Sequence, residues 1–550
     1  MPNGMKVRVG QHRPRGAVRV VVIAAVLALV STLFVGVATA AAPKAAKAAA
    51  PKPGGEITYG LEAESGGGFC LPDARLAISG IEEVAAVYDT LVVPNTKDVM
   101  VPYLAKSVSH DAAFTTWTIV LRDGIKFHDG SALDATVVVN NMVRWTKAAL
   151  IGAAFTNIAS VTATNPTTVT VTTKVPWVAF DAALFGSGRL GIVGQAQLDS
   201  PDCATKMIGT GPFKLDHWTV NEEMVVTKNP NYWQKDANGT QLPYLDKITF
   251  KPVLEAAQRV NSFKSGQFNV IHTTNGQQIT QLLPLANQYN LMQEKPGRRE
   301  VRYYLMNTSK APLDDPNARL AVASAIDRNQ INEVTNAGYN QIADGPFDKD
   351  VAGYLKNPGY PKFDLKKATD LATAYKAAHG GQFTVVLEHT NDPANADEAQ
   401  VIKQQLAKAG IDATLKSEDQ TAFIISAVTQ NFSIMLWRNH PGEDPDTQYQ
   451  WWTGTGNTLL DFGKISDPTL QTLLDQGRSE TDAAKRKTIY EQVNQEFSKQ
   501  VFNVWGYYIQ WLIAAQKNVQ GLAGPPLPDK GGNPLFIYGR HPLLGIYLTK

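Results

Sequence analysis

Residues 116–145 read TWTIVLRDGIKFHDGSALDATVVVNNMVRW, and this stretch decides the fold of the chain. It opens with Trp117, Ile119 and Leu121, which alternate with threonine and valine. A two-residue period is typical of a strand with one buried face, because successive side chains point to opposite faces of a sheet. We therefore expect a strand that begins near Thr116 and ends near Leu121.

A turn, a short return strand and a second turn should follow this strand. Arg122–Gly124 ends in glycine and predicts the first turn, and Asp129–Gly130 predicts the second. Between the two turns, Ile125–His128 is expected to form the return strand. The order of these pieces predicts a hairpin with a charged turn.

A helix is expected after the second turn. Asp134 is a candidate N-cap, because its carboxylate can accept hydrogen bonds from the first backbone N–H groups of a helix. Val138, Met142 and Trp145 then recur at helical spacing and define one apolar face. A strand and a capped helix in one block are typical of an α/β protein.

The length and composition of the chain limit its class. It has 550 residues, which is more than one hydrophobic core usually supports, so we expect two lobes or more. Charged residues make up 19% of the chain, hydrophobic residues 44%, and the formal net charge is +2. Because a nucleic-acid-binding protein needs a strongly basic surface, we expect no nucleic-acid partner.

The N-terminal residues have the pattern of an export signal. Lysines and arginines precede the apolar run Val20–Val37, and Ala38–Ala40 offers small residues for a signal peptidase. We expect cleavage after Ala40 and export to the cell surface, the periplasm or the medium. An uncleaved anchor stays open, because the run is nearly long enough to span a bilayer. Residues 41–53 should be a flexible Ala/Pro/Lys linker. Because no cysteine lies near Ala40, we expect no lipid anchor.

The chain contains two cysteines, Cys70 and Cys203, and both lie in the exported part. A disulfide between them is the simplest prediction for an extracytoplasmic protein. Two buried free thiols are the alternative. No metal site is expected here, because no further Cys or His stands at ligand spacing.

A second distinctive block, Gly209–Trp233, reads GTGPFKLDHWTVNEEMVVTKNPNYW. Its Gly-Thr-Gly-Pro start predicts a turn before two strands, and Asn229-Pro230 ends the second strand. A phosphate-binding loop is excluded. The glycines do not have the G-x-G-x-x-G spacing, Pro212 lacks a backbone donor, and no Lys-Ser or Lys-Thr pair follows.

The remaining chain alternates between expected strands and helices. The expected strands and helices are Gly55–Gly60, a hairpin in Val161–Val175, a strand with Ile248 and Phe250, a helix in Glu255–Lys264, Val301–Asn307, a helix in Asn317–Arg328, Phe383–His389, a helix in Asp397–Gly410, Ile411–Lys416 and a helix in Lys485–Phe497. Strand, helix and strand in residues 383–416 predict a βαβ unit.

Four of these blocks together resemble one protein family. The block around Leu121–Gly130 is similar to "LRDGVKFHDG", Gly209–Trp233 to "GTGPY…NPNYW", Ser265–Asn269 to a closing "GEVD" motif, and Asn317–Arg328 to a helix of the same family. The family is that of the large solute-binding proteins of ABC importers, family 5, which includes dipeptide and oligopeptide receptors. Gln267 and Asn269 depart from the pattern, since the family usually has acids there.

The resemblance implies a fold and a role. The fold would be an α/β, two-lobed, periplasmic-binding-protein-like clamp of type II, with an extra subdomain in the first lobe and a hinge of two strands. Lobe I would comprise residues 54–298 and 513–550 with a subdomain at about 95–205, and lobe II residues 299–512. We place the crossings near Arg299–Asn307 and Val504–Leu512. The partners would be a small solute and a membrane ABC permease, and we expect a monomer.

A secreted hydrolase is the main alternative, and such an enzyme would need a catalytic motif. No G-x-S-x-G elbow and no H-E-x-x-H helix occur in the sequence. His128 and Asp129 are adjacent on an expected strand and would point to opposite faces, so they cannot act as a dyad. We therefore expect no enzyme and no cofactor. A receptor that senses its ligand without transporting it stays open.

The candidate ligand site is residues 435–452, MLWRNHPGEDPDTQYQWW. An apolar strand ends there in a polar loop between tryptophans, and aromatic walls with a few placed charges are typical of a solute pocket. The alternative is a surface loop with two buried tryptophans. The candidate ligand-binding residues are Trp437, Arg438, Asn439, His440, Asp444, Asp446 and Trp451.

One of these positions departs from the peptide-binding relatives. Their strand ends in a tryptophan, which Trp437 matches, and an aspartate three residues later holds the ammonium group of the ligand. His440 stands at that place in this chain. A charge-assisted hydrogen bond contributes roughly 1.5–3 kcal/mol, and a neutral imidazole cannot replace its ionic part. Asp444 or Glu443 could take this role, so a peptide or peptide-like ligand is the prediction.

Overall fold

The computed structural model describes residues 51–65, 67–74, 76, 79–148, 151–453 and 461–549. The predicted signal sequence with Ala40, and nearly all of the predicted linker, lie outside these residues. Residues 50–550 form one compact unit, which is the unit described below. No helix in the described part of the chain is both long and apolar enough to cross a membrane.

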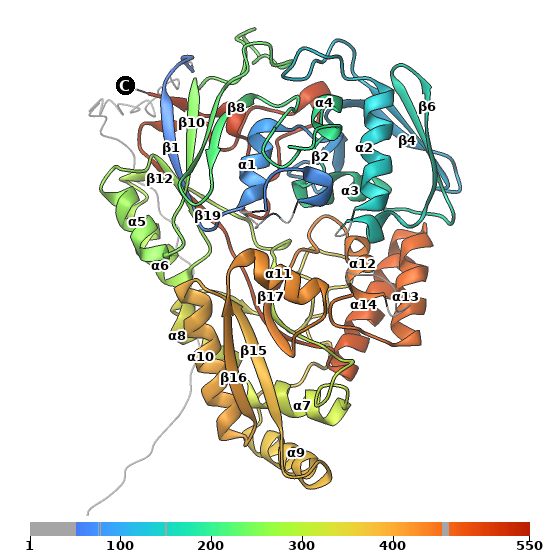
Figure 1. Ribbon diagram of the computed structural model, residues 1–550, viewed down its shortest axis with the longest axis vertical. Coiled ribbons are helices and arrows are strands. Elements are labelled where there is room, and N and C mark those ends of the chain that lie inside the picture. Colours follow the sequence, from blue (N-terminus) through green and yellow to red (C-terminus); the bar gives the residue numbers. More distant parts are fainter. Residues whose placement is uncertain are drawn as a thin grey trace, which may run out of the picture. The chain divides into compact units, whose positions relative to one another are not determined.

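Two large sheets form the cores of two lobes (Figure 1). The first sheet has seven strands in the order β12 (Tyr289–Gln293), β19 (Leu512–Gln516), β11 (Val270–Thr273), β1 (Glu56–Leu61), β10 (Lys247–Pro252), β9 (Glu223–Lys228) and β8 (Phe213–Thr219). Strand β1 is parallel to both β10 and β11, whereas β19 is antiparallel to β11 and β12. This sheet therefore joins segments from both ends of the described chain.

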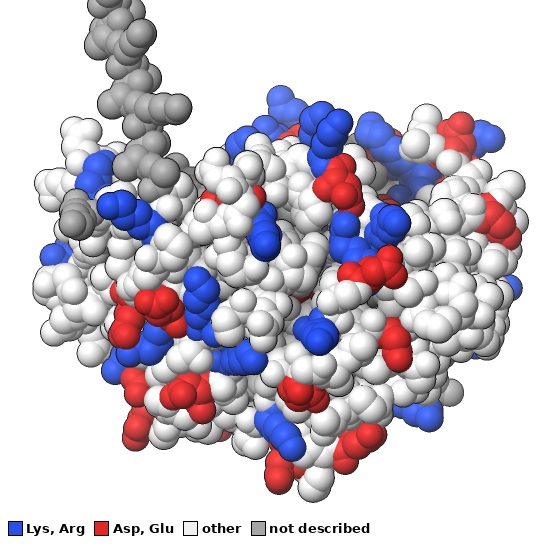
Figure 2. All heavy atoms as spheres, turned by 90° about the horizontal axis from the view of Figure 1, so that it is seen from above, with Lys and Arg blue, Asp and Glu red and all other residues white. Residues whose placement is uncertain are grey.

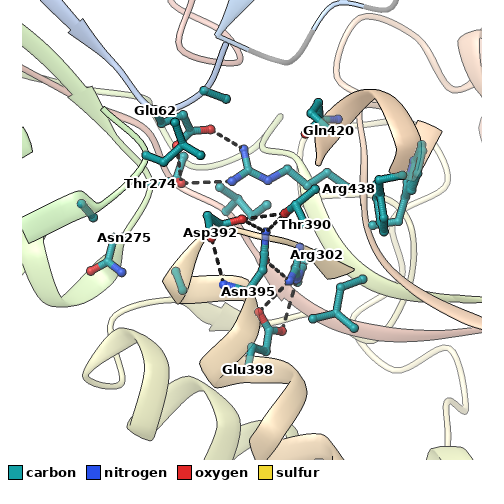
Figure 3. A pocket seen from close by; sticks show the side chains of 18 of the residues that line it. Glu62, Thr274, Asn275, Arg302, Thr390, Asp392, Asn395, Glu398, Gln420 and Arg438 are labelled. Carbon is teal, nitrogen blue, oxygen red and sulfur yellow. Dashed lines mark hydrogen bonds and ion pairs between the residues drawn. The ribbon is translucent and has the colours of Figure 1, made fainter. Parts of the chain in front are cut away.

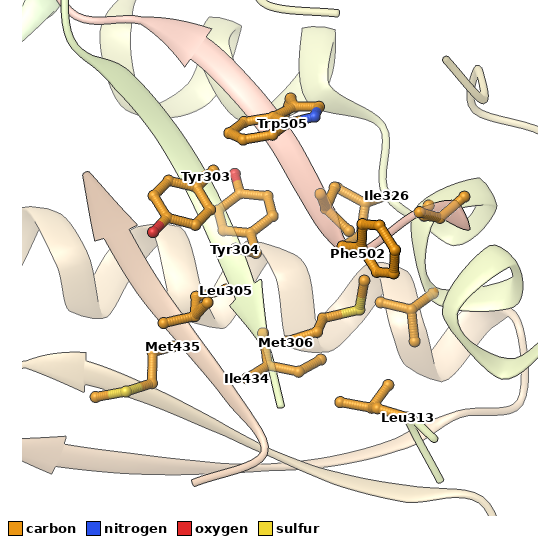
Figure 4. Close-up of a cluster of buried hydrophobic side chains, with 14 of the residues drawn as sticks. Tyr303, Tyr304, Leu305, Met306, Leu313, Ile326, Ile434, Met435, Phe502 and Trp505 are labelled. Atoms are coloured by element: carbon orange, nitrogen blue, oxygen red, sulfur yellow. The ribbon is translucent and has the colours of Figure 1, made fainter. Parts of the chain in front are cut away.

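The second sheet has six strands in the order β14 (Gln341–Ile342), β18 (Asn503–Tyr508), β13 (Val301–Met306), β17 (Ile434–Asn439), β15 (Thr384–Thr390) and β16 (Asp412–Glu418). All six residues of β13 are buried, because this inner strand is covered on both faces. Figure 4 shows Tyr304 and Met306 of β13 among side chains of β17 and β18. Strands β15 and β16 are parallel and are linked by helix α10 (Pro393–Lys408), which confirms the predicted βαβ unit.

Within the block 116–145, residues 116–121 form part of a third, antiparallel sheet. Its order is β4 (Ala105–His110), β5 (Thr116–Leu121), β7 (Thr168–Thr173) and β6 (Ile158–Asn165). The predicted strand is β5, and its alternate residues Trp117, Ile119 and Leu121 are buried as expected. The predicted hairpin in Val161–Val175 is β6 and β7.

The predicted helix of this block is α2 (Ala135–Lys147), and it packs on the same sheet. The Asp134 carboxylate accepts a hydrogen bond from the Val137 backbone N–H at 2.9 Å, so the predicted N-cap is confirmed. Val138, Met142 and Trp145 are fully buried. The predicted return strand at Ile125–His128 is wrong: only a single bridge joins Lys126 to Ala132, because the two turns leave too few residues for a ladder.

The other elements cover the sheets. The helices are α1 (Gly80–Val87), α3 (Phe180–Phe185), α4 (Gln195–Leu198), α5 (Ala256–Lys264), α6 (Gly276–Leu282), α7 (Pro316–Ala325), α8 (Arg328–Asn336), α9 (Leu365–Ala378), α10 (Pro393–Lys408), α11 (Gln420–Val428), α12 (Tyr449–Trp452), α13 (Pro468–Ser479) and α14 (Ala483–Gln500). Two short pairs complete the strands, β2 (Val92–Pro94) with β3 (Met100–Pro102) and β20 (Val519–Gln520) with β21 (Tyr547–Leu548).

The helix predicted for Asn317–Arg328 is α7, but it ends at Ala325, and a second helix, α8, begins at Arg328. Ile326 has an extended backbone (φ −91°, ψ 109°), which ends α7. The next residue, Asp327, accepts hydrogen bonds from the backbone N–H groups of Asn329 and Gln330. An aspartate inside a predicted helix is therefore the N-cap of the next one.

The two signature blocks meet at His128. Its Nε2 lies 3.0 Å from the Gly211 carbonyl oxygen, and its Nδ1 accepts from the Gly209 backbone N–H at 3.4 Å. A Cβ at Gly209 would lie 2.0 Å from the Val87 carbonyl oxygen, and one at Gly211 would lie 2.5 Å from it. The glycines therefore let the second block pass between α1 and the first block.

The chain passes between the two large sheets twice, in residues 294–300 and 509–511. The segment from 301 to 306, which was predicted as a crossing, is already the inner strand β13. The two passing segments are paired: Ile509 N–H donates to the Glu300 carbonyl and Glu294 N–H to the Trp511 carbonyl, both at 2.9 Å. The lobe limits that were predicted at residues 298 and 512 stay a prediction.

The surface of the described unit mixes charges of both signs. On the face drawn in Figure 2, Lys and Arg side chains are interspersed with Asp and Glu. This agrees with 52 basic and 50 acidic residues in the whole chain.

His128 gives a pH-dependent prediction. Burial lowers the pKa of His128 from 6.5 to about 4. The neutral ring suits both contacts, because Nε2–H donates to Gly211 while Nδ1 accepts from Gly209. The unfolded chain binds this proton more readily, so the stability is complete above about pH 6.5 and is lost towards pH 4.

We expect a His128→Gln variant to lose this part of the pH dependence. Between pH 6.5 and 4.5, the unfolding free energy of the wild type should fall by roughly 2 kcal/mol more than that of the variant. Urea unfolding at several pH values measures both slopes. Equal slopes would contradict the role given to His128.

Candidate functional site

Two adjoining cavities lie between the lobes. The polar cavity has a volume of about 240 Å³ and the aromatic cavity about 180 Å³. Both are lined by residues of the two lobes. Six residues line both cavities, which makes them one continuous cleft: Leu76, Arg189, Ile424, Trp437, Arg438 and His440.

An ion pair across the lobes forms one wall of the polar cavity. Arg438, on β17, donates from Nη1 to the Glu62 carboxylate at 2.9 Å, and Glu62 directly follows β1. Thr274 joins the pair, since its hydroxyl donates to Glu62 at 3.1 Å and lies 3.3 Å from Arg438 Nη2. Figure 3 shows these three side chains together. The contact joins residues of the two lobes across the cleft.

A second ion pair lies within lobe II. Arg302 of β13 donates to the Glu398 carboxylate at 2.9 Å, and both side chains are almost fully buried. Glu398 also accepts from the hydroxyls of Tyr304 at 2.8 Å and Tyr507 at 3.2 Å. The attraction of this carboxylate, together with that of the neighbouring phenol groups, raises the pKa of Arg302 although burial opposes it.

Asp392 lies between these two pairs (Figure 3). It caps helix α10, accepting from the Asn395 backbone N–H at 3.0 Å and from the Thr390 hydroxyl at 2.6 Å. No Lys or Arg of the described chain lies within ion-pair distance of it. Its carboxylate therefore faces the cavity with hydrogen-bond donors as neighbours and no cation paired to it.

The aromatic cavity is built around Trp437. Its ring stacks on Phe423 with centroids 5.2 Å apart, and it meets the edge of Phe462 at 5.4 Å. Trp451 packs against the same Phe462 at 5.3 Å, and Trp177 lines the cavity from lobe I. The arrangement offers flat apolar surfaces for an apolar part of a solute.

His440 lies where the cavities meet, and it touches the passing segment of the chain. Its Nδ1 is 2.5 Å from the buried carboxylate of Glu300, which also accepts from the Trp511 indole N–H at 2.6 Å. Burial lowers the pKa of His440, and the Glu300 carboxylate opposes this shift. The imidazole of His440 therefore already has a partner within the protein, the Glu300 carboxylate.

The acidic loop residues are also occupied. Asp444 forms a bidentate pair with Arg486, at 2.8 and 2.5 Å, and lies outside the lining of both cavities. Asp444 was one of two residues that could have taken the role of the missing aspartate, but a movement into the cleft would break its pair with Arg486. Asp446 does line the aromatic cavity, but Arg478 donates to it at 2.9 Å and the Trp177 indole N–H at 2.6 Å.

Six of the seven candidate residues thus lie at the cleft. Trp437, Arg438, Asn439, His440, Asp446 and Trp451 line it, and Asp444 does not. Sequence reasoning missed the residues that face them from other segments, namely Glu62, Arg189, Arg259, Arg302, Asp392 and Glu398. Among the described residues, no group of three or more His, Cys, Asp or Glu is placed to hold a metal ion.

A disulfide supports one wall of the cleft. Cys70 and Cys203, the predicted pair, are joined in the structure. Cys70 belongs to the connection between β1 and α1, which supplies Glu62, Ala74 and Leu76 to the cavities. The Phe69 backbone N–H also donates to the Ala204 carbonyl at 2.7 Å. The bond fixes this connection to lobe I beside the cleft.

Comparison with known proteins gives a family. Residues 99–459 match the family described as "Bacterial extracellular solute-binding proteins, family 5 Middle". The glutathione-binding protein GsiB of Escherichia coli K12 is 31% identical over 406 residues, which cover 70% of this chain and 76% of that protein.

Solved structures share the fold. The periplasmic binding protein DppA of Helicobacter pylori, in complex with the peptide STSA, has a TM-score of 0.78 at 22% identity and covers 91% of this chain and 99% of its own. AgaA of A. tumefaciens R10, in complex with agropinic acid, has a TM-score of 0.78 at 23% identity, with coverages of 90% and 99%. The predicted two-lobed α/β clamp is confirmed by these structures.

The disulfide gives a stability prediction. The variant Cys70→Ser/Cys203→Ser removes a bond between positions 133 residues apart. Loss of a cross-link over so long a loop should lower the unfolding free energy by about 2–5 kcal/mol. Urea unfolding of the oxidised wild type and of the variant measures the difference. The reduced wild type is the matched control and should behave as the variant does; if all three unfold alike, the prediction is wrong.

Proposed function

The chain belongs to the bacterial extracellular solute-binding proteins of family 5, and from this premise we propose that it captures a peptide or peptide-like solute and delivers it to the membrane permease of an ABC importer. The observation that carries the proposal is the continuous cleft between the lobes, with Trp437, Arg438 and His440 at its centre. Closure of two lobes around a solute is a recognised mode of capture.

The ion pair between Arg438 and Glu62 supports a binding mechanism by closure. Its two members belong to different lobes, so the pair forms when the cleft shuts. His440 links the cleft to Glu300 in one of the two passing segments. A solute that contacts Trp437 and Arg438 would therefore favour the closed arrangement, which is the form that a permease can distinguish.

The relatives support a peptide-like ligand. GsiB is named for glutathione and the DppA structure contains a peptide. In this chain His440 cannot supply a carboxylate for an ammonium group, and Asp444 is held by Arg486. Asp392 is the better candidate for that role, because its carboxylate lines the polar cavity without a paired cation in the described chain.

We further propose that the chain is exported, acts as a monomer and catalyses no reaction. Its N-terminal basic residues and apolar run support export. The family supports binding without turnover. Mass spectrometry of a bound peptide before and after incubation tests the last point, since a hydrolase would shorten the peptide.

The ligand class can be tested directly. We expect denaturing mass spectrometry of the protein purified from its own cells to release a peptide-like compound. Calorimetry with glutathione and with peptides of two to nine residues should then find at least one micromolar ligand, which corresponds to about 8 kcal/mol. Binding of sugars alone would contradict the peptide assignment and leave the receptor assignment standing.

Trp437 is expected to contribute through its ring. Trp437→Ala should weaken binding of that ligand about tenfold or more, because a stacking surface in the cleft is lost. Phe363→Ala is the matched control, since Phe363 is 46% exposed and lines neither cavity. An unchanged affinity for Trp437→Ala, measured by calorimetry, would remove the aromatic cavity from the proposal.

A further inference from the structure

Arg189 lies where the polar and aromatic cavities meet, and it lines both. It follows a tight turn after α3, in which Gly186 and Gly188 have φ values of +51° and +83°. The Arg189 backbone N–H donates to the Gly186 carbonyl at 3.1 Å, which fixes the start of the side chain. The turn thus places a guanidinium in the centre of the cleft.

The other arginines of the cleft have partners in the protein. Arg438 pairs with Glu62, Arg302 with Glu398, and Arg478 with Asp446. Arg259 has no carboxylate partner, but it donates to the backbone carbonyls of His272 and Val253. These four arginines are therefore bonded to groups of the protein itself.

Arg189 differs from them. Within the described residues, no carboxylate lies within ion-pair distance of its guanidinium and no side-chain hydrogen bond from it is found. The nearest acidic groups that influence it are Glu443 and Glu300, at longer range. Burial works against its charge, yet an arginine remains protonated in a protein. The Arg189 side chain is half-buried, so it gives up part of its hydration without gaining a partner among the described residues.

The two acids near Arg189 are engaged elsewhere. Glu300 is paired with His440 and bonded to the Trp511 indole. Glu443 accepts from the Tyr538 hydroxyl at 3.1 Å, and burial raises its pKa to about 7. Neither of these two acids forms an ion pair with Arg189.

The charges of the whole cleft agree with this local picture. Five arginines line the two cavities: Arg189, Arg259, Arg302, Arg438 and Arg478. Four carboxylates line them: Glu62, Asp392, Glu398 and Asp446. Among these nine groups, which leave out His440 and its partner Glu300, the arginines exceed the carboxylates by one.

Resting on the proposed function, we propose that Arg189 binds a carboxylate of the solute, and that the solute carries one net negative charge and an apolar group. The guanidinium forms two parallel hydrogen bonds with a carboxylate, and the pair is strengthened by the exclusion of water. The apolar group lies in the aromatic cavity beside Trp437. A peptide with two carboxylates and one ammonium group has this net charge, and Asp392 is the group that binds its ammonium.

The test compares matched probes and matched variants. The probes are a pool of short peptides with free C-terminal carboxylates, the same peptides amidated, and a pool of neutral sugars. Thermal shift identifies the pool that binds, and calorimetry then gives affinities for its best member and for the amidated partner. The variants are Arg189→Ala, Arg189→Lys and Lys366→Ala, which removes a surface charge from a side chain 86% exposed and outside both cavities.

We expect the free acid to bind the wild type at least 30-fold more tightly than its amide. Arg189→Ala should lose at least 30-fold for the acid, because a buried charged hydrogen bond is lost, and should no longer distinguish acid from amide. Arg189→Lys should recover part of the loss, since a lysine keeps the charge without the planar fork. Lys366→Ala should bind as the wild type does. Circular dichroism and the unliganded melting temperature exclude misfolding of the Arg189 variants, and Arg189→Gln replaces any variant that fails this check.

Each other outcome has a meaning. If free acids bind and Arg189→Ala binds them unchanged, the Arg189 inference is wrong while the proposed function stands. The same holds if amides bind as tightly as acids. Binding of the sugar pool alone would contradict both the carboxylate and the peptide assignment. If no pool binds, both the inference and the proposed function fail.

Discussion

The two paired passages of the chain between the lobes are the constraint on which the rest of this structure depends. Residues 294–300 and 509–511 are held side by side by backbone hydrogen bonds at 2.9 Å. The Glu294 carbonyl also accepts from the Gln510 side chain at 2.8 Å. Within the described unit the chain passes between the two large sheets only in these two segments, so a rotation of one lobe against the other would have to bend both of them. The cleft walls are then brought together by a rotation, and few residues need to change their packing.

Charged side chains inside the cleft are the second organising feature. Some are paired with each other and form the walls of the cleft, and others are left to contact a solute. Paired groups such as Arg302 and Glu398 gain little net stability from their attraction, because both must leave water. Their value is positional, since breaking one partner would leave the other charged and buried. The pair of Arg438 and Glu62 differs in that its members belong to different lobes. It links a charge interaction to closure, whereas Arg189 leaves its charge for a solute.

Periodicity and turn chemistry predicted the local structure from the sequence. The alternation around Trp117 and the cap at Asp134 gave β5 and α2, because these signals depend on neighbours in the chain. The same local reasoning failed at Asp327, where a capping side chain outweighs helical spacing. It failed in a different way for the cleft. Glu62 and Arg189 are brought to Arg438 by tertiary packing, and no spacing along the chain encodes that meeting.

His440 shows that the scaffold and the binding site of this chain can differ in how closely they follow the family pattern. The tryptophan at the end of β17 is kept, so the strand and its aromatic wall follow the family pattern. Three residues later, the imidazole turns to Glu300 in a passing segment of the chain. That position therefore contacts a passing segment of the chain, and under the proposed function an ammonium group of the solute would be bound elsewhere in the cleft. Asp392 caps α10 in lobe II, and Arg189 lies in the turn after α3 in lobe I. A solute that contacted both side chains would itself join the lobes. Recognition and closure would then be one event.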